Sequence, residues 1–379
     1  LIIATGSTPR MLFDIEGIKN ARTFRSASDS ECIAECSKGK NVVMMGVGPI
    51  GLELLDTLCA LEGPKKIYLV SRGTHLYDKA MGPTSVQMIK SIYEEADSRV
   101  EILLEDEILE KKIEGEEITQ VVMKSRTIDD PFIVFGVGIR PSMECAKGTV
   151  DIDRGILVDE HMRTSDPSIY AVGEVAQMPD GYIAGRVREC TLQADAAIAS
   201  ILGIEDKGFQ EFVTIDGLKV GSFLLADVTS TYYDPKDPDN EDIVLSSKQD
   251  KRIDQYIINK DRLVRFIGMN TNVDVIALKR IMEEDEKVDP SYFYSNRLLS
   301  ERGKLICSCA SGYEKDLVDI IKTNCVESFS DLKPFSEAGR VCGRCKKDVE
   351  QLISDTPVDP EEAARIKAER EAAAKEEEL

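Results

Sequence analysis

Four cysteines near the C-terminal end of the chain have the spacing of a closed metal site. Cys307 and Cys309 are separated by one residue, and Cys342 and Cys345 follow later as a CxxC pair. Thiolates at two separated points can hold zinc or an iron-sulfur cluster, because soft sulfur donors suit both. Zinc sites usually combine two CxxC-like turns, so the short CxC segment favours an iron-sulfur cluster, and zinc stays an alternative.

The remaining cysteines do not repeat this spacing. Cys32 and Cys36 lie four residues apart and would meet on one face of a helix, but ordinary packing is the simpler interpretation of the pair. The chain holds ten cysteines in all, and the scattered ones are Cys32, Cys36, Cys59, Cys145, Cys190 and Cys325.

A glycine-rich turn is the second group of residues with chemical meaning. The apolar run 41–45 has the length of a strand, and it leads into the turn 46–51. A helical stretch then extends through Leu61, and a second strand is predicted at 66–70. A GxGxxG turn between a strand and a helix, followed by a second strand, is typical of dinucleotide binding.

Each glycine of this turn has a predicted role. Gly46 permits the tight turn, Gly48 lets the backbone approach a pyrophosphate, and Gly51 allows close helix packing. The second strand ends at Ser71 and Arg72, where an acidic residue would bind the 2′-hydroxyl of NAD. The arginine favours the 2′-phosphate of NADPH, and a solvated loop side chain is the alternative.

The following segments are richer in strand-forming residues. Short runs at 100–104, 118–124 and 131–135 predict a β-meander that completes the nucleotide domain. It ends at Gly136 and Gly138, where missing side chains would let the backbone pass close to a ligand.

A further strand at 168–172 ends in Gly173 and Glu174, and a helix is predicted from Thr191 to Leu202. A carboxylate directly after a strand is well placed to accept hydrogen bonds from sugar-like hydroxyls.

The length and charge of the chain limit the classes of protein to which it can belong. A chain of 379 residues with 42% hydrophobic content predicts two or three domains. The net charge of −21 argues against nucleic-acid binding. The sequence has no apolar run long enough to span a membrane, and many cysteines without a secretory signal favour a reducing, cytoplasmic location. The chain opens on an apparent core strand, Leu1–Gly6, which predicts a fragment of a longer protein.

Several separated stretches together resemble one family. The segments 4–7, 46–53, 137–141 and 169–174 resemble the FAD-dependent pyridine nucleotide-disulfide oxidoreductases. The cysteine segment resembles the [2Fe-2S] domain related to bacterioferritin-associated ferredoxin, which strengthens iron-sulfur over zinc. Taken together in this order along the chain, the oxidoreductase-like segments and the cysteine segment resemble the reductase half of NAD(P)H-dependent assimilatory nitrite reductase large subunits.

The resemblance implies three sets of site residues. FAD would bind at Ala4, Thr5, Gly6, Gly173 and Glu174, with the helix near Thr191 pointing its positive end at the flavin ring. NAD(P)H would bind at Gly46, Gly48, Gly51, Glu53 and Gly138, and the position at the end of the second strand adds Ser71 and Arg72 to this site. The [2Fe-2S] cluster would bind at Cys307, Cys309, Cys342 and Cys345.

The predicted fold class is α/β, with a Rossmann-type NAD(P)-binding domain inserted in an incomplete FAD-binding domain. An α/β C-terminal segment and a small helical [2Fe-2S] module follow. The predicted boundaries are 1–20 for the end of the first FAD-binding segment, 21–140 for the NAD(P) domain, 141–205 for the second FAD-binding segment, 206–300 for an interface domain, 303–353 for the cluster module and 354–379 for a solvated helical tail. The usual FAD-binding turn would precede Leu1.

The predicted function is electron transfer from NAD(P)H through FAD to the cluster. The partner would be an electron-acceptor protein or a sirohaem-containing reductase domain, and a homodimer is compatible with this interpretation. Two alternatives stay open: an NAD(P)H oxidase with O2 as acceptor, and a non-enzymatic zinc-containing scaffold with a vestigial nucleotide fold. Flavin suits the relay because it converts a two-electron hydride into the single electrons that a cluster accepts.

Overall fold

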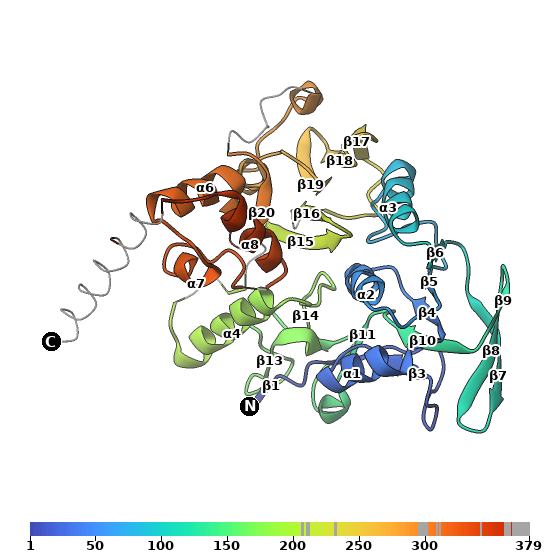
Figure 1. Cartoon of the computed structure of the whole chain (residues 1–379). Coiled ribbons are helices and arrows are strands. Elements are labelled where there is room, and N and C mark those ends of the chain that lie inside the picture. Colours follow the sequence, from blue (N-terminus) through green and yellow to red (C-terminus); the bar gives the residue numbers. More distant parts are fainter. Residues whose placement is uncertain are drawn as a thin grey trace. The chain divides into compact units, whose positions relative to one another are not determined.

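The computed structural model divides the chain into two compact units, each discontinuous in sequence (Figure 1). The first comprises Leu1–Asp78 and Glu94–Glu211, and the second comprises Lys79–Tyr93 and Phe212–Leu379. The structure describes residues 1–205, 208–209, 213–230, 233–294, 302–307, 310, 312–341, 343–359 and 365.

A five-stranded parallel sheet forms the centre of the first unit. Its middle strand β4 (Asn41–Met45) lies between β10 (Pro131–Phe135) and β5 (Lys66–Val70). All five residues of β10 are buried, as expected of a strand that is covered on both faces. The outer strands β3 (Ala21–Thr23) and β6 (Val100–Leu103) complete the order β3-β10-β4-β5-β6.

The predicted β-meander is wrong for two of its three strands. The runs at 100–104 and 131–135 belong to the parallel sheet, because their side chains are largely buried and need cover on both faces. The middle run forms β8 (Glu117–Met123), which pairs antiparallel with β7 (Ile108–Glu114) and β9 (Thr127–Asp129).

Three helices of the first unit accompany these strands. Helix α1 (Ala27–Cys36) begins at a capping box, and α2 (Pro49–Ala60) directly follows the glycine turn. Helix α4 (Val187–Leu202) begins earlier than the predicted Thr191 and ends at Gly203, which has the left-handed conformation typical of helix ends.

Short strand pairs join segments that are far apart in the sequence. The N-terminal strands pair with strands that follow residue 138, so the first residues lie beside the 173–174 segment. The pairs are β1 (Ile2–Ile3) with β13 (Tyr170–Ala171), β2 (Ser7–Pro9) with β11 (Ile139–Pro141), and β12 (Ile156–Leu157) with β14 (Ala176–Gln177). Two 3-10 helices, η1 (Glu144–Ala146) and η2 (Gly173–Val175), lie in the same region.

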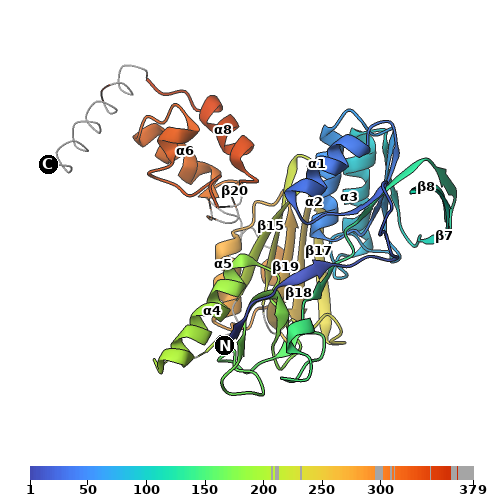
Figure 2. The same ribbon diagram turned by 90° about the horizontal axis from the view of Figure 1, so that it is seen from below.

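The second unit is built on a five-stranded antiparallel sheet of order β15-β16-β19-β18-β17 (Figure 2). Helix α5 (Val275–Glu283) shares an apolar core with Tyr256 on one face of the sheet. The neighbouring residue Gln255 accepts a hydrogen bond from Ser85 Oγ of α3 (Pro83–Ala96) at 3.4 Å. Successive strand residues point to opposite faces, so the two helices cover opposite sides of the sheet. The remaining elements are β15 (Thr214–Val220), β16 (Phe223–Thr229), β17 (Asn240–Ser247), β18 (Arg252–Asn259), β19 (Arg262–Met269) and η3 (Pro290–Tyr294).

The cysteine-rich segment forms a small, mostly helical module with an apolar cluster of its own. Its elements are β20 (Leu305–Cys307), β21 (Gly312–Tyr313), α6 (Glu314–Thr323), α7 (Phe329–Leu332) and α8 (Lys346–Asp355). Most of the predicted tail at 354–379 lies outside the described residues. None of the helices described here has both the length and the apolar content needed to cross a membrane.

A buried ion pair braces the antiparallel sheet, and its removal gives a testable stability change. Arg265 Nη2 lies 2.7 Å from Asp227 Oδ2, and the two side chains are only 8% and 4% exposed. We expect Asp227→Ala to lower the free energy of unfolding by about 3–5 kcal/mol, because it removes the carboxylate that faces a buried guanidinium. Urea denaturation measures this change. Asp239→Ala, which breaks an exposed pair with Lys260, should change stability little, and equal losses in both variants would contradict the expectation.

Candidate functional site

The predicted nucleotide turn is built from backbone contacts that leave no room for side chains. Gly46 has a φ of 114°, and a Cβ at this position would overlap the carbonyl oxygen of Gly136. A Cβ at Gly51 would overlap the carbonyl oxygen of Gly46. Helix α2 therefore starts in close contact with the end of β4, at the carboxyl edge of the parallel sheet, where ligands bind in such folds.

Gly48 differs from the other two glycines because no atom lies within 4 Å of a Cβ built there. It is the N-cap residue of α2, Pro49 follows it, and no side chain caps the helix at this residue. The first amides of α2 and the space beside Gly48 suit an anionic group such as a pyrophosphate. Glu53, one turn further along α2, is half-buried.

The other predicted nucleotide-binding residues lie at the ends of β5 and β10. Ser71 is buried, and its Oγ accepts a hydrogen bond from the Gly73 amide at 3.1 Å, so this side chain shapes the turn. Arg72 is exposed at the same turn. Gly138 has a φ of 96°, and its carbonyl oxygen accepts a hydrogen bond from the Arg10 amide at 2.9 Å.

The residues predicted for FAD come together from both ends of the first unit. A Cβ at Gly6, where φ is 64°, would lie 3.9 Å from Glu174 Oε2. Thr5 Oγ1 donates a hydrogen bond to the Ser142 carbonyl at 2.6 Å, and Ala4 beside it is exposed. Gly173 has a φ of 79°, so the backbone turns sharply before Glu174.

The Glu174 carboxylate is held by two residues that the sequence analysis missed. Its Oε2 accepts hydrogen bonds from Ser7 Oγ at 2.7 Å and from Arg25 Nη2 at 2.9 Å. Burial by itself would raise the pKa of Glu174, but the bonds from Arg25 and Ser7 outweigh it and bring the pKa below its ordinary value. The carboxylate is therefore ionised and fixed in position at neutral pH.

Gln193 is a third residue that the sequence analysis missed. It is fully buried on α4, and its Oε1 accepts a hydrogen bond from the Gly173 amide at 2.8 Å. Its Nε2 has no hydrogen-bond partner among the residues that the structure describes. A buried amide that lacks an acceptor is costly, so this donor fits a ligand with an acceptor atom beside Gly173. The sequence signal that could have identified Gln193 is an amide side chain on the otherwise Ala-rich, buried face of this helix.

Two of the four predicted metal ligands are described, and both lie in the core of the module. Cys307 is 2% exposed and Cys345 is 5% exposed, and both belong to the module's apolar cluster. Cys345 is the N-cap residue of α8, so the positive end of the helix dipole favours a thiolate at this residue. Cys309 and Cys342 lie outside the described residues.

Comparison with known proteins decides the family. The model of the pyridine nucleotide-disulphide oxidoreductase family matches residues 1–198, which is more than half of the 379 residues. The chain belongs to this family. A model of the BFD-like [2Fe-2S] binding domain matches residues 305–355. These matches confirm the predicted family, the α/β fold class, the cofactor classes and the iron-sulfur identity of the cysteine module, whereas the individual site residues stay predictions.

Curated relatives extend over almost the whole length of this oxidoreductase. It is 25% identical over 373 residues to the nitrite reductase [NAD(P)H] of Bacillus subtilis (strain 168), a match that covers 94% of the chain and 45% of that protein. It is also 25% identical to the assimilatory nitrate reductase electron transfer subunit of the same organism, covering 93% of the chain and 46% of that protein. The chain thus spans less than half the length of these relatives.

A solved structure shows the same fold. The match to a chain of the covalent putidaredoxin reductase–putidaredoxin complex has a TM-score of 0.66 at 23% identity, and it covers 79% of this oxidoreductase and 72% of that chain. At this identity, the likeness supports the fold and says nothing of the acceptor.

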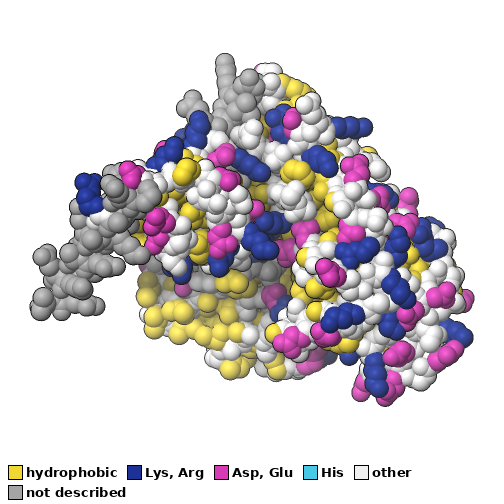
Figure 3. All heavy atoms as spheres, viewed as in Figure 1, with side chains coloured by type: hydrophobic (Ala, Val, Ile, Leu, Met, Phe, Trp, Pro, Cys, Tyr) yellow, Lys and Arg dark blue, Asp and Glu magenta, His cyan; other side chains and the backbone are white. Residues whose placement is uncertain are grey.

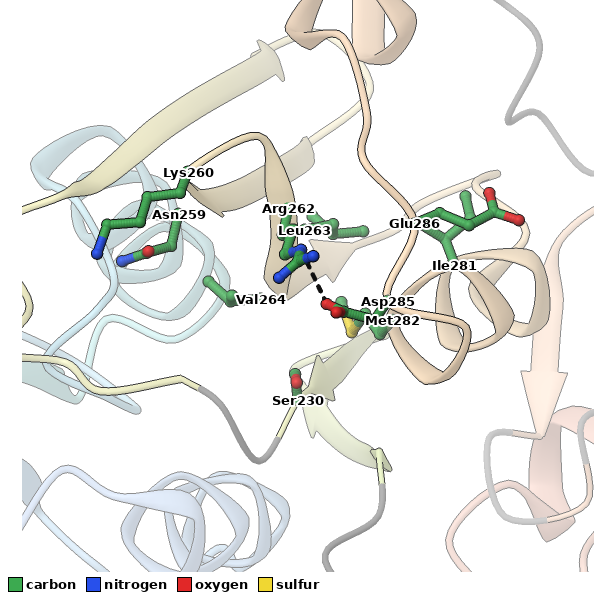
Figure 4. A pocket seen from close by; sticks show the side chains of 10 residues that line it. All are labelled: Ser230, Asn259, Lys260, Arg262, Leu263, Val264, Ile281, Met282, Asp285 and Glu286. Atoms are coloured by element: carbon green, nitrogen blue, oxygen red, sulfur yellow. Dashed lines mark ion pairs between the residues drawn. The ribbon is translucent and has the colours of Figure 1, made fainter.

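A cavity in the second unit is lined by residues of β18, β19 and α5 and of the turns beside them. Figure 4 shows its lining side chains, and its volume is about 290 Å³. Arg262 at its wall is directed at Asp285, and the two form an ion pair at 3.0 Å. No predicted site residue lines this cavity, so we assign it no role in cofactor binding.

Helix α4 of this oxidoreductase carries an exposed apolar face. A cluster of hydrophobic side chains is visible over this helix at the lower left of Figure 3. The most exposed are Val187 at 85% and Leu202 at 66%, with Ile198 and Ile201 both at 48%. Contiguous exposed apolar residues of this kind are typical of an interaction surface.

The Arg25–Glu174 pair predicts a defined pH dependence of stability. Glu174 has a folded-state pKa below its ordinary value, so its stabilising contribution is present above the unfolded pKa and is lost as pH falls through the folded pKa. Arg25→Ala should raise the pKa of Glu174, since burial then dominates. Wild type and variant should differ in unfolding free energy at pH 7 and converge in acid. Lys19→Ala, which breaks an exposed pair with Glu116, is the control. A constant difference at every pH would refute the assignment.

Proposed function

We propose that this protein is an NAD(P)H-dependent flavoprotein oxidoreductase that passes electrons through FAD to a [2Fe-2S] cluster and on to an acceptor. The observation that carries the proposal is the combination in one chain of a dinucleotide turn, a fixed carboxylate and an iron-sulfur module. The alternatives explain less: an O2-reducing oxidase needs no cluster, and a zinc scaffold needs no ordered carboxylate at the flavin site.

The residues of the first unit would bind and orient the two nucleotides. The α2 amides beside Gly48 would hold the pyrophosphate of NAD(P)H, and exposed Arg72 favours the 2′-phosphate of NADPH. The ionised Glu174 would accept hydrogen bonds from FAD hydroxyls, because Arg25 and Ser7 keep it charged and fixed. Gln193 Nε2 would donate to an acceptor atom of the flavin. When bound, FAD accepts a hydride and releases single electrons.

The module would hold the cluster away from water. Cys307 and Cys345 supply buried thiols, and we propose Cys309 and Cys342 as the other two ligands. The positive end of α8 would favour thiolates bound to metal over free thiols at these positions. The apolar residues around the cluster would limit its contact with water and so help to set its reduction potential.

The acceptor is proposed from the relatives. Two curated relatives are named as a nitrite reductase and as an electron transfer subunit of nitrate reductase. We therefore propose a separate electron-acceptor protein or a sirohaem-containing reductase domain as the acceptor, in the cytoplasm. A homodimer is a further proposal, and light scattering of the purified protein tests it.

Reconstitution tests the proposed function. The protein is loaded with FAD, iron and sulfide under anaerobic conditions and supplied with NADPH or NADH. We expect iron and sulfide to be bound in equal amounts, with reduction of cytochrome c by either nucleotide. Zinc with negligible iron would favour the scaffold, and oxygen uptake that matches all NAD(P)H consumed in the presence of cytochrome c would favour the oxidase.

A further inference from the structure

Helix α1 carries a pair of thiols that lies outside the residues assigned to FAD, NAD(P)H and the cluster. Cys32 Sγ and Cys36 Sγ lie 3.3 Å apart on one face of the helix. Cys36 is exposed and Cys32 is half-buried, so the pair is open to small molecules from one side. The simpler interpretation as ordinary packed residues is therefore wrong for Cys36.

We propose that Cys32 and Cys36 form a reversible dithiol–disulfide site that reacts with small-molecule disulfides. Cys36 is the entry thiol because it is exposed, and Cys32 is the resolving thiol because its sulfur is already in contact with that of Cys36. The two-cysteine spacing, the exposure and the contact distance carry this inference, and it is independent of the proposed electron transfer.

The bond requires a local change of helix geometry. Residues four apart in an α-helix have Cα atoms separated by about 6 Å, within the range of about 4.4–6.8 Å found for disulfides, but their Cβ atoms are about 5–6 Å apart, farther than the roughly 3.5–4.5 Å of a disulfide. Cys36 is the last residue of α1, and Ser37 is the C-cap. Helix ends fray more readily than helix interiors, so the backbone at Cys36 can shift to bring the sulfurs to bonding distance.

The exchange proceeds in two balanced steps. The Cys36 thiolate attacks one sulfur of the small disulfide, a mixed disulfide forms, and one small thiol leaves with the proton that Cys36 lost. Cys32 then attacks Cys36 Sγ, the bond to the small molecule breaks, and the second small thiol leaves with the proton of Cys32. The two protein thiols lose two electrons in total, and these reduce one small disulfide to two thiols.

Neither cysteine of the pair is in a disulfide in the structure. Burial and the hydrogen bond with Cys32 raise the pKa of the Cys36 thiol. The Cys36 sulfur therefore carries hydrogen at neutral pH, and exchange uses its minor thiolate fraction.

Oxidised glutathione is the probe, and tryptic mapping of the intact, treated protein is the measurement. Cleavage after Arg25 and Lys38 releases a peptide, 26–38, that contains these two cysteines and no other. We expect this peptide to lose both thiol hydrogens and to carry no glutathione. Cys145 is exposed and has no sulfur neighbour recorded within the described part of the chain, so it should retain a glutathione adduct and serves as the internal reference.

Two variants separate the roles of the thiols. Cys32→Ser should leave a persistent glutathione adduct on Cys36, since no resolving thiol remains. Cys36→Ser should greatly reduce labelling of the peptide, because the half-buried Cys32 is the poorer entry thiol. A persistent adduct in the wild-type peptide, or a peptide that stays reduced while Cys145 is modified, would overturn the proposal. Circular dichroism of both variants checks that they are folded.

Discussion

Cys345→Ser is expected to remove the iron-sulfur cluster and with it the reduction of cytochrome c by NAD(P)H. The Cys345 thiol is buried in the module core at the start of α8, and a serine hydroxyl is a poor ligand for iron. Iron content and the visible absorption of the cluster should fall to background, and cytochrome c reduction should fall by more than about tenfold, which corresponds to at least about 1.4 kcal/mol. Ferricyanide reduction by the FAD-loaded protein should persist.

Cys325→Ser provides a matched control within the same module. Cys325 is also buried, but it lies outside the CxC and CxxC segments. Its replacement should leave iron content and cytochrome c reduction near those of the wild type. Equal loss of iron in both variants would indicate that the module is merely destabilised, and unchanged cytochrome c reduction in Cys345→Ser would refute the relay.

Gly48→Val is expected to weaken NAD(P)H binding without disturbing the fold. A Cβ at Gly48 meets no protein atom within 4 Å, so the added side chain would occupy only the space proposed for the pyrophosphate. We expect the dissociation constant to rise by more than about tenfold, or at least about 1.4 kcal/mol. Fluorescence titration with NADPH and NADH measures it, and thermal unfolding checks the fold.

Substitutions at two other glycines serve as controls for Gly48→Val. Gly46→Ala should lower the thermal midpoint, because Gly46 has a φ of 114° and a Cβ there would overlap the Gly136 carbonyl oxygen. Gly82→Val should change neither property, since Gly82 also has open space around it and lies outside the predicted site. NAD(P)H affinity that is unchanged in Gly48→Val would mean that the nucleotide binds elsewhere.

Local sequence patterns were sufficient to predict several elements with accurate bounds. The runs 41–45, 66–70 and 131–135 were predicted as strands at the limits that the structure shows, because each is a short apolar run of strand length. The glycine spacing and the cysteine spacing are equally local, so they indicated the cofactor classes before any fold was known.

Sheet membership was not predictable in the same way. The run 131–135 was assigned to a meander, but it inserts between β3 and β4 of the parallel sheet. The same apolar run could form a strand of an antiparallel meander or a strand of the parallel sheet. The choice depends on whether other elements cover both faces of the strand, and this is decided only in the tertiary structure.

The sequence by itself determined the types of cofactor site in this protein, since glycine turns and thiol pairs are short-range patterns with few chemical uses. Tertiary structure alone decided which side chains complete those sites. Ser7 and Arg25 reach Glu174 across 167 and 149 residues, and Gln193 reaches Gly173 from a helix. Such contacts depend on strand pairing between distant segments, and no local pattern encodes which distant residue will supply the partner for a buried carboxylate or amide.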